Sequence, residues 1–126
     1  MSWTVDPRSD VPPSRQLVEA LLDAISAGEL RPGAQLPSVR ALAAEALVNH
    51  NTVARAYRDL EQMGAVEGQN GRGVFVTAGG VEVARAARRA TTLAAFRRAL
   101  FEALRAGHGR DELERILREA ELRRTA

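Results

Sequence analysis

The segment 36–57, with the sequence LPSVRALAAEALVNHNTVARAY, limits the fold of this chain more than any other feature. Ser38 is a good N-cap for one helix, whose apolar residues recur at helical spacing, and Asn49 is a good N-cap for a second. On the helix that Asn49 caps, a core face centred on Val53 lies opposite a polar face of amide and guanidinium side chains. Two helices joined by a tight turn, the second with a polar opening, are typical of a helix-turn-helix that places a helix end in a DNA groove.

The residues after Gly64 predict a β-hairpin. The sequence AVEGQNGRGVFVTA gives two short strands around a glycine-rich tip, where Asn70-Gly71 is a strong hairpin-turn signal. A helix-turn-helix followed by a hairpin with an arginine at its tip predicts a winged helix. The fold class is therefore mainly α with a small β-hairpin.

The N-terminal region predicts one strand and one helix. Trp3 and Val5 alternate with polar neighbours, so we expect a short edge strand there. Pro12 and Pro13 then open a helix, because the first turn of a helix tolerates the missing N–H group. Gly28 is the expected stop of this helix.

The composition changes at Gly79-Gly80 to alanine, arginine and leucine with helical periodicity. We therefore expect a winged helix-turn-helix DNA-binding domain over residues 1–79 and a two-helix tail over 80–126. The apolar stripes of the tail either pack back onto their own domain or pack against the same helices of a second copy. We favour the second arrangement, since dimeric DNA readers match the two-fold symmetry of their sites. The dimerisation stripe comprises Leu93, Phe96, Leu100, Phe101, Leu104, Leu113, Ile116 and Leu117.

The cationic side chains suit nucleic acid, although the net charge is only +2. All 18 are arginine, and the planar guanidinium binds phosphate or guanine through two parallel hydrogen bonds. Most of these arginines are also consistent with ordinary solvated helix faces.

Several function classes are excluded by what the chain lacks. It has no cysteine, and its two histidines, His50 and His108, are too few for a zinc cluster, so we expect no metal. No apolar run approaches the ~20 residues of a membrane span, and the N-terminus lacks a signal pattern. We therefore expect a cytoplasmic, nucleoid-associated protein without a membrane partner.

The opening of the third helix carries the candidate base-reading residues. Asn49, His50, Asn51 and Thr52 are short hydrogen-bonding side chains that can read base edges in a major groove, and asparagine prefers adenine. The free N–H groups of the helix end suit a phosphate. Alternatively, Asn49 only caps the helix and His50 is only solvated.

Two further arginines are placed to reach DNA. Arg40 lies in the first turn of the helix that crosses the DNA backbone in a helix-turn-helix. Arg72 lies between Gly71 and Gly73, and an arginine at such a tip can enter a minor groove or hold a phosphate. An exposed arginine on an ordinary hairpin is the alternative. The full candidate DNA-binding set is Ser38, Arg40, Asn49, His50, Asn51, Thr52, Arg55, Arg58, Gly71, Arg72 and Gly73.

From Pro12 to Val76 the chain resembles the GntR family of transcriptional regulators, and within it the YtrA-like branch with a short helical tail. The stretches LRPGAQLPSVRALA and NHNTVARAYRDLE are its most specific signatures. The resemblance implies a winged helix-turn-helix, a homodimer formed through the tail helices, and an operator with inverted-repeat symmetry. By position, Arg40 resembles the family's DNA-contacting arginine of the second helix.

The chain also departs from the family pattern. Many relatives have arginine at the positions of His50 and Ala54, so a guanine-reading pattern is weakened here. Arg55 and Arg58 could compensate from the polar face of the same helix.

We therefore expect a sequence-specific transcriptional repressor that binds double-stranded operator DNA as a homodimer. The third helix would enter the major groove, and the wing would contact the backbone or the minor groove. The alternative is a winged-helix module that binds protein or RNA without operator specificity. A small-molecule effector at the dimer interface or between the domains stays open, and the sequence names none.

An enzyme is not expected. Some members of the wider family carry an aminotransferase-like domain that uses pyridoxal phosphate, and that chemistry needs a lysine for its Schiff base. This chain has no lysine and is far too short for such a domain, so we expect no cofactor.

Overall fold

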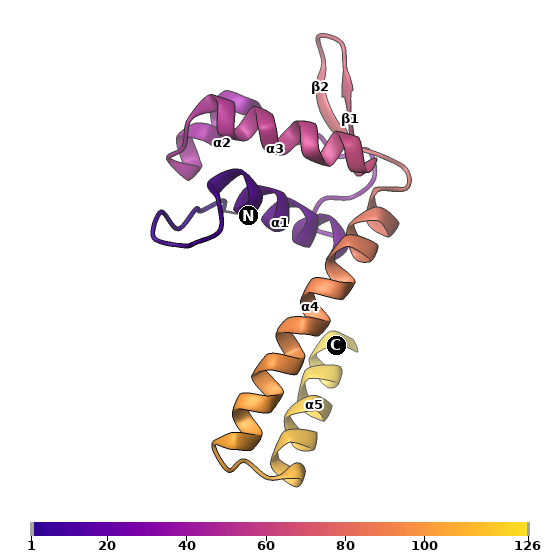
Figure 1. The fold of residues 1–126 in the computed structure, drawn as a ribbon. Coiled ribbons are helices and arrows are strands. Elements are labelled where there is room, and N and C mark those ends of the chain that lie inside the picture. The colour runs from indigo at the N-terminus through magenta and orange to yellow at the C-terminus, as the bar shows by residue number, and fades with distance from the viewer. Residues whose placement is uncertain (1, 126) are drawn as a thin grey trace. The chain divides into compact units, whose positions relative to one another are not determined.

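The computed structural model describes residues 2–125, which form five helices and one antiparallel hairpin (Figure 1). This confirms a mainly helical winged helix-turn-helix with a helical tail. The elements in chain order are α1 (Pro13–Ser26), α2 (Val39–Ala46), α3 (His50–Met63), β1 (Val66–Gln69), β2 (Gly73–Val76), α4 (Gly80–Arg105) and α5 (Arg110–Thr125). The chain divides into two compact units, the first ending at Ala90 and the second beginning at Thr91.

The core of the first unit forms where α1 and α2 pack against α3. Figure 1 shows α3 running alongside α1, with the hairpin projecting from the opposite side of α3. The apolar face expected on α3 is confirmed, because Val53, Ala56, Tyr57 and Leu60 are all buried. The largest fully buried side chains are Leu17, Leu21, Ile25, Leu42, Val53, Leu60 and Val66.

The helix ends follow local sequence signals. The Ser38 hydroxyl accepts a hydrogen bond from the N–H of Ala41 at 3.1 Å, and the Asn49 side chain accepts one from the N–H of Asn51 at 2.7 Å. Both bonds satisfy N–H groups that a helix end would otherwise leave unpaired. Gly64 ends α3 in the left-handed conformation with φ +87°, which glycine adopts without steric cost.

The two-stranded hairpin also bonds to the segment before α2, through an isolated bridge between Gln35 and Phe75. β1 and β2 pair from Val66↔Val76 to Gln69↔Gly73. The other edge of β2 bonds to the segment before α2: the Leu36 N–H donates to the Val74 carbonyl at 2.8 Å. The hairpin is therefore fixed at its base by the α1–α2 connection.

The expected edge strand at Trp3 and Val5 is wrong. No strand is assigned to residues 2–6. The backbone N–H and carbonyl of Asp6 instead bond to the Gln16 side chain, at 2.9 and 3.0 Å. The apolar alternation reports burial only, since Trp3 is in the core and Val5 packs against it.

The packing of the first unit continues beyond Gly79, where we expected the DNA-binding domain to end. Ala84 is fully buried, and Val81 and Val83 pack against the same core. The Arg85 guanidinium also donates to the Ser26 carbonyl at 3.3 Å, which ties the start of α4 to the end of α1. Residues 80–90 of α4 thus belong to the first compact unit.

The second unit contains the rest of α4 and all of α5, which runs back along it (Figure 1). Between Thr91 and Thr125 no described side chain is buried. Leu100 and Leu113 are half-buried. The other apolar residues of the expected dimerisation stripe are exposed: Leu93, Phe96, Phe101, Leu104, Ile116 and Leu117.

The position of the boundary can be tested with two fragments. A fragment ending at Ala90 should keep the packing of the first unit, whereas one ending at Gly79 loses the buried Ala84 and its neighbours on α4. We expect the shorter fragment to be less stable by about 2 kcal/mol or more, the cost of exposing a few apolar side chains. Urea denaturation of both fragments measures the difference, and equal midpoints would place the end of the folded unit at Gly79.

Candidate nucleic-acid interface

The opening of α3 presents four polar side chains in succession. Asn49, His50 and Asn51 are exposed, and Thr52 is half-buried. Because the side-chain oxygen of Asn49 accepts the capping hydrogen bond, the side-chain NH₂ group is the part that could donate to a base. The capping role expected of Asn49 is confirmed, and base contacts by these four residues stay a prediction.

The polar face of α3 continues the same exposed surface. Arg55 and Arg58 are exposed, whereas Val53 and Ala56 point into the core. A helix with one buried face and one exposed guanidinium-bearing face can lie in a groove without losing its own packing. Contacts of Arg55 and Arg58 with DNA stay a prediction.

The first turn of α2 places Arg40 in solvent directly after its cap. The Ser38 hydroxyl is engaged in that cap, so its place in the candidate set rests on the exposed end of α2 that it shapes. An exposed arginine at this end can reach a phosphate while the core residue Leu42 holds the helix in place.

Tyr57 joins α3 to the start of α2. Its hydroxyl donates a hydrogen bond of 2.6 Å to the carbonyl of Pro37, the residue before the Ser38 cap. Burial disfavours the phenolate and raises the pKa of Tyr57 well above its usual value. The bond fixes the end of α2 that carries Arg40 relative to the middle of α3.

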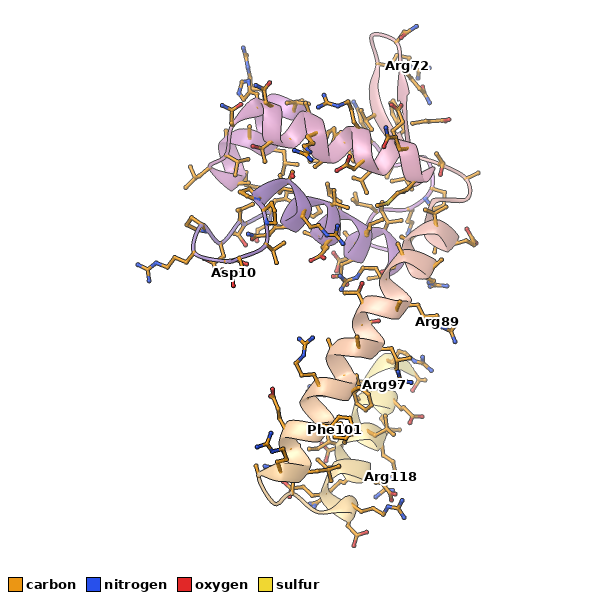
Figure 2. The ribbon with its side chains drawn as sticks, in the orientation of Figure 1. Asp10, Arg72, Arg89, Arg97, Phe101 and Arg118 are labelled. Carbon is orange, nitrogen blue, oxygen red and sulfur yellow. The ribbon has the colours of Figure 1, made fainter. Side chains whose placement is uncertain are left out.

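The wing tip exposes Arg72 between two glycines with positive φ, +71° at Gly71 and +122° at Gly73. Figure 2 shows Arg72 at the end of the hairpin, away from the helices of the first unit. The turn is closed by a hydrogen bond of 3.0 Å from the Arg72 N–H to the Gln69 carbonyl. This geometry leaves the guanidinium accessible to a ligand.

Two contacts that hold the wing have no signal in the sequence. The Gln35 amide donates to the Arg72 carbonyl at 2.9 Å, and the Glu61 carboxylate accepts from the Gly68 N–H at 2.7 Å. Exposed glutamine and glutamate are common on any surface. Only the pairing of distant segments shows that Gln35 and Glu61 support the hairpin.

Other kinds of site find no support in the part of the chain that the structure describes. Within residues 2–125, no three histidine, cysteine, aspartate or glutamate side chains form a group that could hold a metal ion. None of the described helices combines the length and the apolar character needed to cross a bilayer.

The comparison with protein families identifies the family of this winged helix. The pattern described as "Bacterial regulatory proteins, gntR family" matches residues 13–76, from the start of α1 to the end of β2. This match covers half of the chain. The chain belongs to the GntR family. All the helix-turn-helix and wing residues named above lie inside the match.

The chain is similar to transcriptional regulators of this family. The HTH-type transcriptional repressor YtrA of Bacillus subtilis (strain 168) is 40% identical over 73 residues, which cover 58% of this chain and 56% of that protein. The chain thus spans little more than half the length of that relative. That relative is named as a transcriptional repressor and not as an enzyme.

Solved structures extend the likeness. YtrA from Sulfolobus acidocaldarius, a GntR-family transcription factor, has a TM-score of 0.58 and 35% identity, over 73% of this chain and 94% of that one. AraR(DBD), solved in complex with operator ORX1, has a TM-score of 0.56 and 25% identity, over 60% of this chain and 96% of that one.

The Tyr57 hydrogen bond predicts a loss of stability in alkali. In the unfolded chain Tyr57 should lose its proton near pH 10, whereas burial keeps it protonated to higher pH in the folded state. Above about pH 10 the unfolded state therefore binds fewer protons, and the free energy of unfolding falls as pH rises. The chain has one tyrosine, no lysine and no cysteine. In the unfolded chain, Tyr57 is therefore the one side chain expected to titrate between about pH 9.5 and 12.

Urea denaturation at a series of alkaline pH values tests this prediction. Tyr57→Phe should cost about 1 kcal/mol at neutral pH, because it removes the hydrogen bond to the Pro37 carbonyl. It should also abolish most of the alkaline slope. An equal slope in both proteins would contradict the assignment to Tyr57.

Proposed function

We propose that this chain is a sequence-specific transcriptional repressor that binds an inverted-repeat operator as a homodimer. The observation that carries the proposal is that the three candidate DNA-contacting elements are joined by one short segment, Gln35–Ser38. Gln35 bonds to the wing tip, Pro37 to Tyr57 of α3, and Ser38 caps α2. Such an arrangement would present the three elements to DNA together.

The start of α3 is the element proposed to read bases. The exposed amide of Asn51 can pair with adenine through two hydrogen bonds in the major groove. The complex of AraR(DBD) with operator ORX1 supports this use of a similar unit. The likeness to a protein named as a repressor, YtrA of Bacillus subtilis, supports the direction of regulation.

Positioned arginines, more than overall charge, are proposed to supply the phosphate contacts. The first unit holds ten arginines and ten acidic residues, so its formal net charge is zero with neutral histidine. An evenly balanced unit gains affinity for DNA only where its cations face the backbone. Arg40, Arg55, Arg58 and Arg72 are exposed on the elements proposed to meet DNA.

The tail is proposed to form the dimer interface. A two-helix unit with no buried side chain between Thr91 and Thr125 has no core of its own, and small units of this kind rarely fold alone. Its exposed apolar residues include Phe96, Phe101 and Ile116, and Figure 2 shows Phe101 among them on α4. A second copy offers the same apolar stripes, and a two-fold axis would match an inverted repeat.

The experiment that tests the proposal is selection of bound duplexes from a random-sequence pool, with excess non-specific competitor. We expect the recovered sequences to share an inverted repeat, and a competitor-resistant complex to form on it. Recovery of no shared sequence would contradict operator recognition. It would favour the alternative, a module that binds protein or RNA.

Arg40 tests the phosphate contacts on that selected duplex. Arg40→Ala should weaken binding about three- to tenfold and leave the melting temperature nearly unchanged, because the side chain is exposed. The slope of log affinity against log salt should decrease by about 1 for each half-site. Arg15→Ala is the matched control, since Arg15 is an exposed arginine of α1 that pairs with Glu19 at the surface. Equal losses in both variants would show a general charge effect.

Two exposed residues of α4 test the dimer. Phe101→Glu combined with Leu104→Glu should give a monomer by light scattering, because each places a charge in the proposed apolar interface. Operator affinity should fall about tenfold or more, since the half-sites then bind independently. Ala95→Glu with Ala99→Glu adds the same charge on the other side of the helix and should leave a dimer. A dimer in the Phe101 and Leu104 variant would exclude this surface as the interface.

A further inference from the structure

The wing tip depends on one side chain from outside the hairpin. The Gln35 amide reaches across 37 residues of sequence and donates to the Arg72 carbonyl at 2.9 Å. Within the hairpin, the bond that closes the turn runs from the Arg72 N–H to the Gln69 carbonyl. Gln35 therefore adds a second, independent restraint to the backbone of Arg72.

The backbone pairing on this edge of the sheet stops short of the tip. The Leu36 N–H bonds to the Val74 carbonyl at 2.8 Å, and Gln35 faces Phe75 across an isolated bridge. Only the Gln35 side chain extends the support from Val74 to Arg72. The Gln35 side-chain amide thus makes a hydrogen bond to β2's neighbour Arg72 where no backbone pairing with residues 33–36 continues.

Gly73 makes room for this contact. A Cβ atom at Gly73 would lie 2.5 Å from the Gln35 side-chain nitrogen, closer than real Cβ contacts come. The φ of +122° at Gly73 also disfavours any other residue. Glycine at position 73 therefore suits this backbone conformation and leaves the Gln35 amide in place beside it.

The other edge of the hairpin is held differently. The Glu61 carboxylate accepts from the Gly68 N–H at 2.7 Å, opposite Val74 in the register and below the tip. This contact joins β1 to the end of α3 but does not reach Arg72. Gln35 is therefore the side chain that restrains the tip itself.

We infer that Gln35 is a positioning residue that holds Arg72 for contact with DNA. This inference rests on the proposed function. A restrained tip loses less conformational freedom when its guanidinium binds a phosphate or enters the minor groove, and so binds more tightly. Gln35 acts through the Arg72 backbone and makes no contact with DNA of its own.

A double-mutant cycle tests the inference on the full chain. The proteins are wild type, Gln35→Ala, Arg72→Ala and the double variant, and the DNA is the selected inverted-repeat duplex. The readouts are the affinity over a range of salt and, in the free protein, the NMR order parameters of the amides at the wing tip. Gln16→Ala is the matched control, because the Gln16 amide also donates to backbone carbonyls, those of Asp6 and Val11, and lies outside the elements proposed to meet DNA.

We expect Gln35→Ala to lower the order parameters at Arg72 and Gly73 and to weaken binding about three- to tenfold for each half-site, as for a lost hydrogen bond. Its salt slope should shift toward that of Arg72→Ala. The double variant should bind no more weakly than Arg72→Ala, because Gln35 acts only through Arg72. Gln16→Ala should match wild type in affinity and in the order parameters of the wing tip, and melting temperatures should stay within a few degrees.

Three results would overturn the inference. Unchanged order parameters in Gln35→Ala would show that the tip needs no restraint, whether or not DNA binds. Additive losses in the double variant would show that Gln35 contacts DNA directly. Wild-type affinity in Arg72→Ala would remove the wing contact while leaving operator binding by α2 and α3 intact. Failure of wild type to form a competitor-resistant complex would instead overturn the proposed function, and this inference with it.

Discussion

The hydrogen bonds of the segment Gln35–Ser38 are the constraint on which the candidate interface depends. Each of its residues bonds to a different element: Gln35 to the wing tip, Leu36 to β2, Pro37 to Tyr57 of α3, while Ser38 caps α2. Four consecutive residues thus bond to α2, α3 and the wing, whose tip lies 37 residues further along the chain. Because the segment is extended and Leu36 is buried, its polar groups can point to both sides while its own position is held by the core. Loss of any one of these bonds should change the relative positions of the candidate DNA-contacting elements more than the packing of the core.

This arrangement explains how a unit with no net charge could serve as a DNA reader. Affinity for a polyanion usually comes from a broad basic surface, and most of it is lost as salt rises. Here ten arginines are offset by ten acidic residues in the first unit, so the separation of charge across its surface matters more than its sum. A few arginines on fixed elements can then favour one register on DNA over others. Under the proposed function, such a unit should depend on correct geometry more than a strongly basic one would.

The sequence predicted those features whose causes are local. Ser38, Asn49 and Gly64 mark helix ends because each acts on its own helix turn, and the structure confirms all three. The strand expected at Trp3 was wrong because alternation records which side chains are buried, and a loop that wraps a core can alternate as well as a strand. The role of Gln35 could not be predicted, since it depends on the register in which residues 33–36 meet β2. The contact between Gln35 and Arg72 spans 37 residues, so tertiary packing determines it and no local sequence pattern marks it.

The end of the first compact unit is a second feature that local sequence marks only in part. Gly79-Gly80 marks the start of α4 correctly, but a change of composition records where a helix begins and not where its packing ends. The start of α4 is buried against the first unit, and Arg85 closes the end of α1, so one helix serves two units. Residues 91–125 have no buried side chain. Their apolar stripes contribute to the free energy of folding only when another surface covers them. If a second copy does so, folding of α5 and formation of the dimer are one equilibrium, and the tail should become more ordered as protein concentration rises.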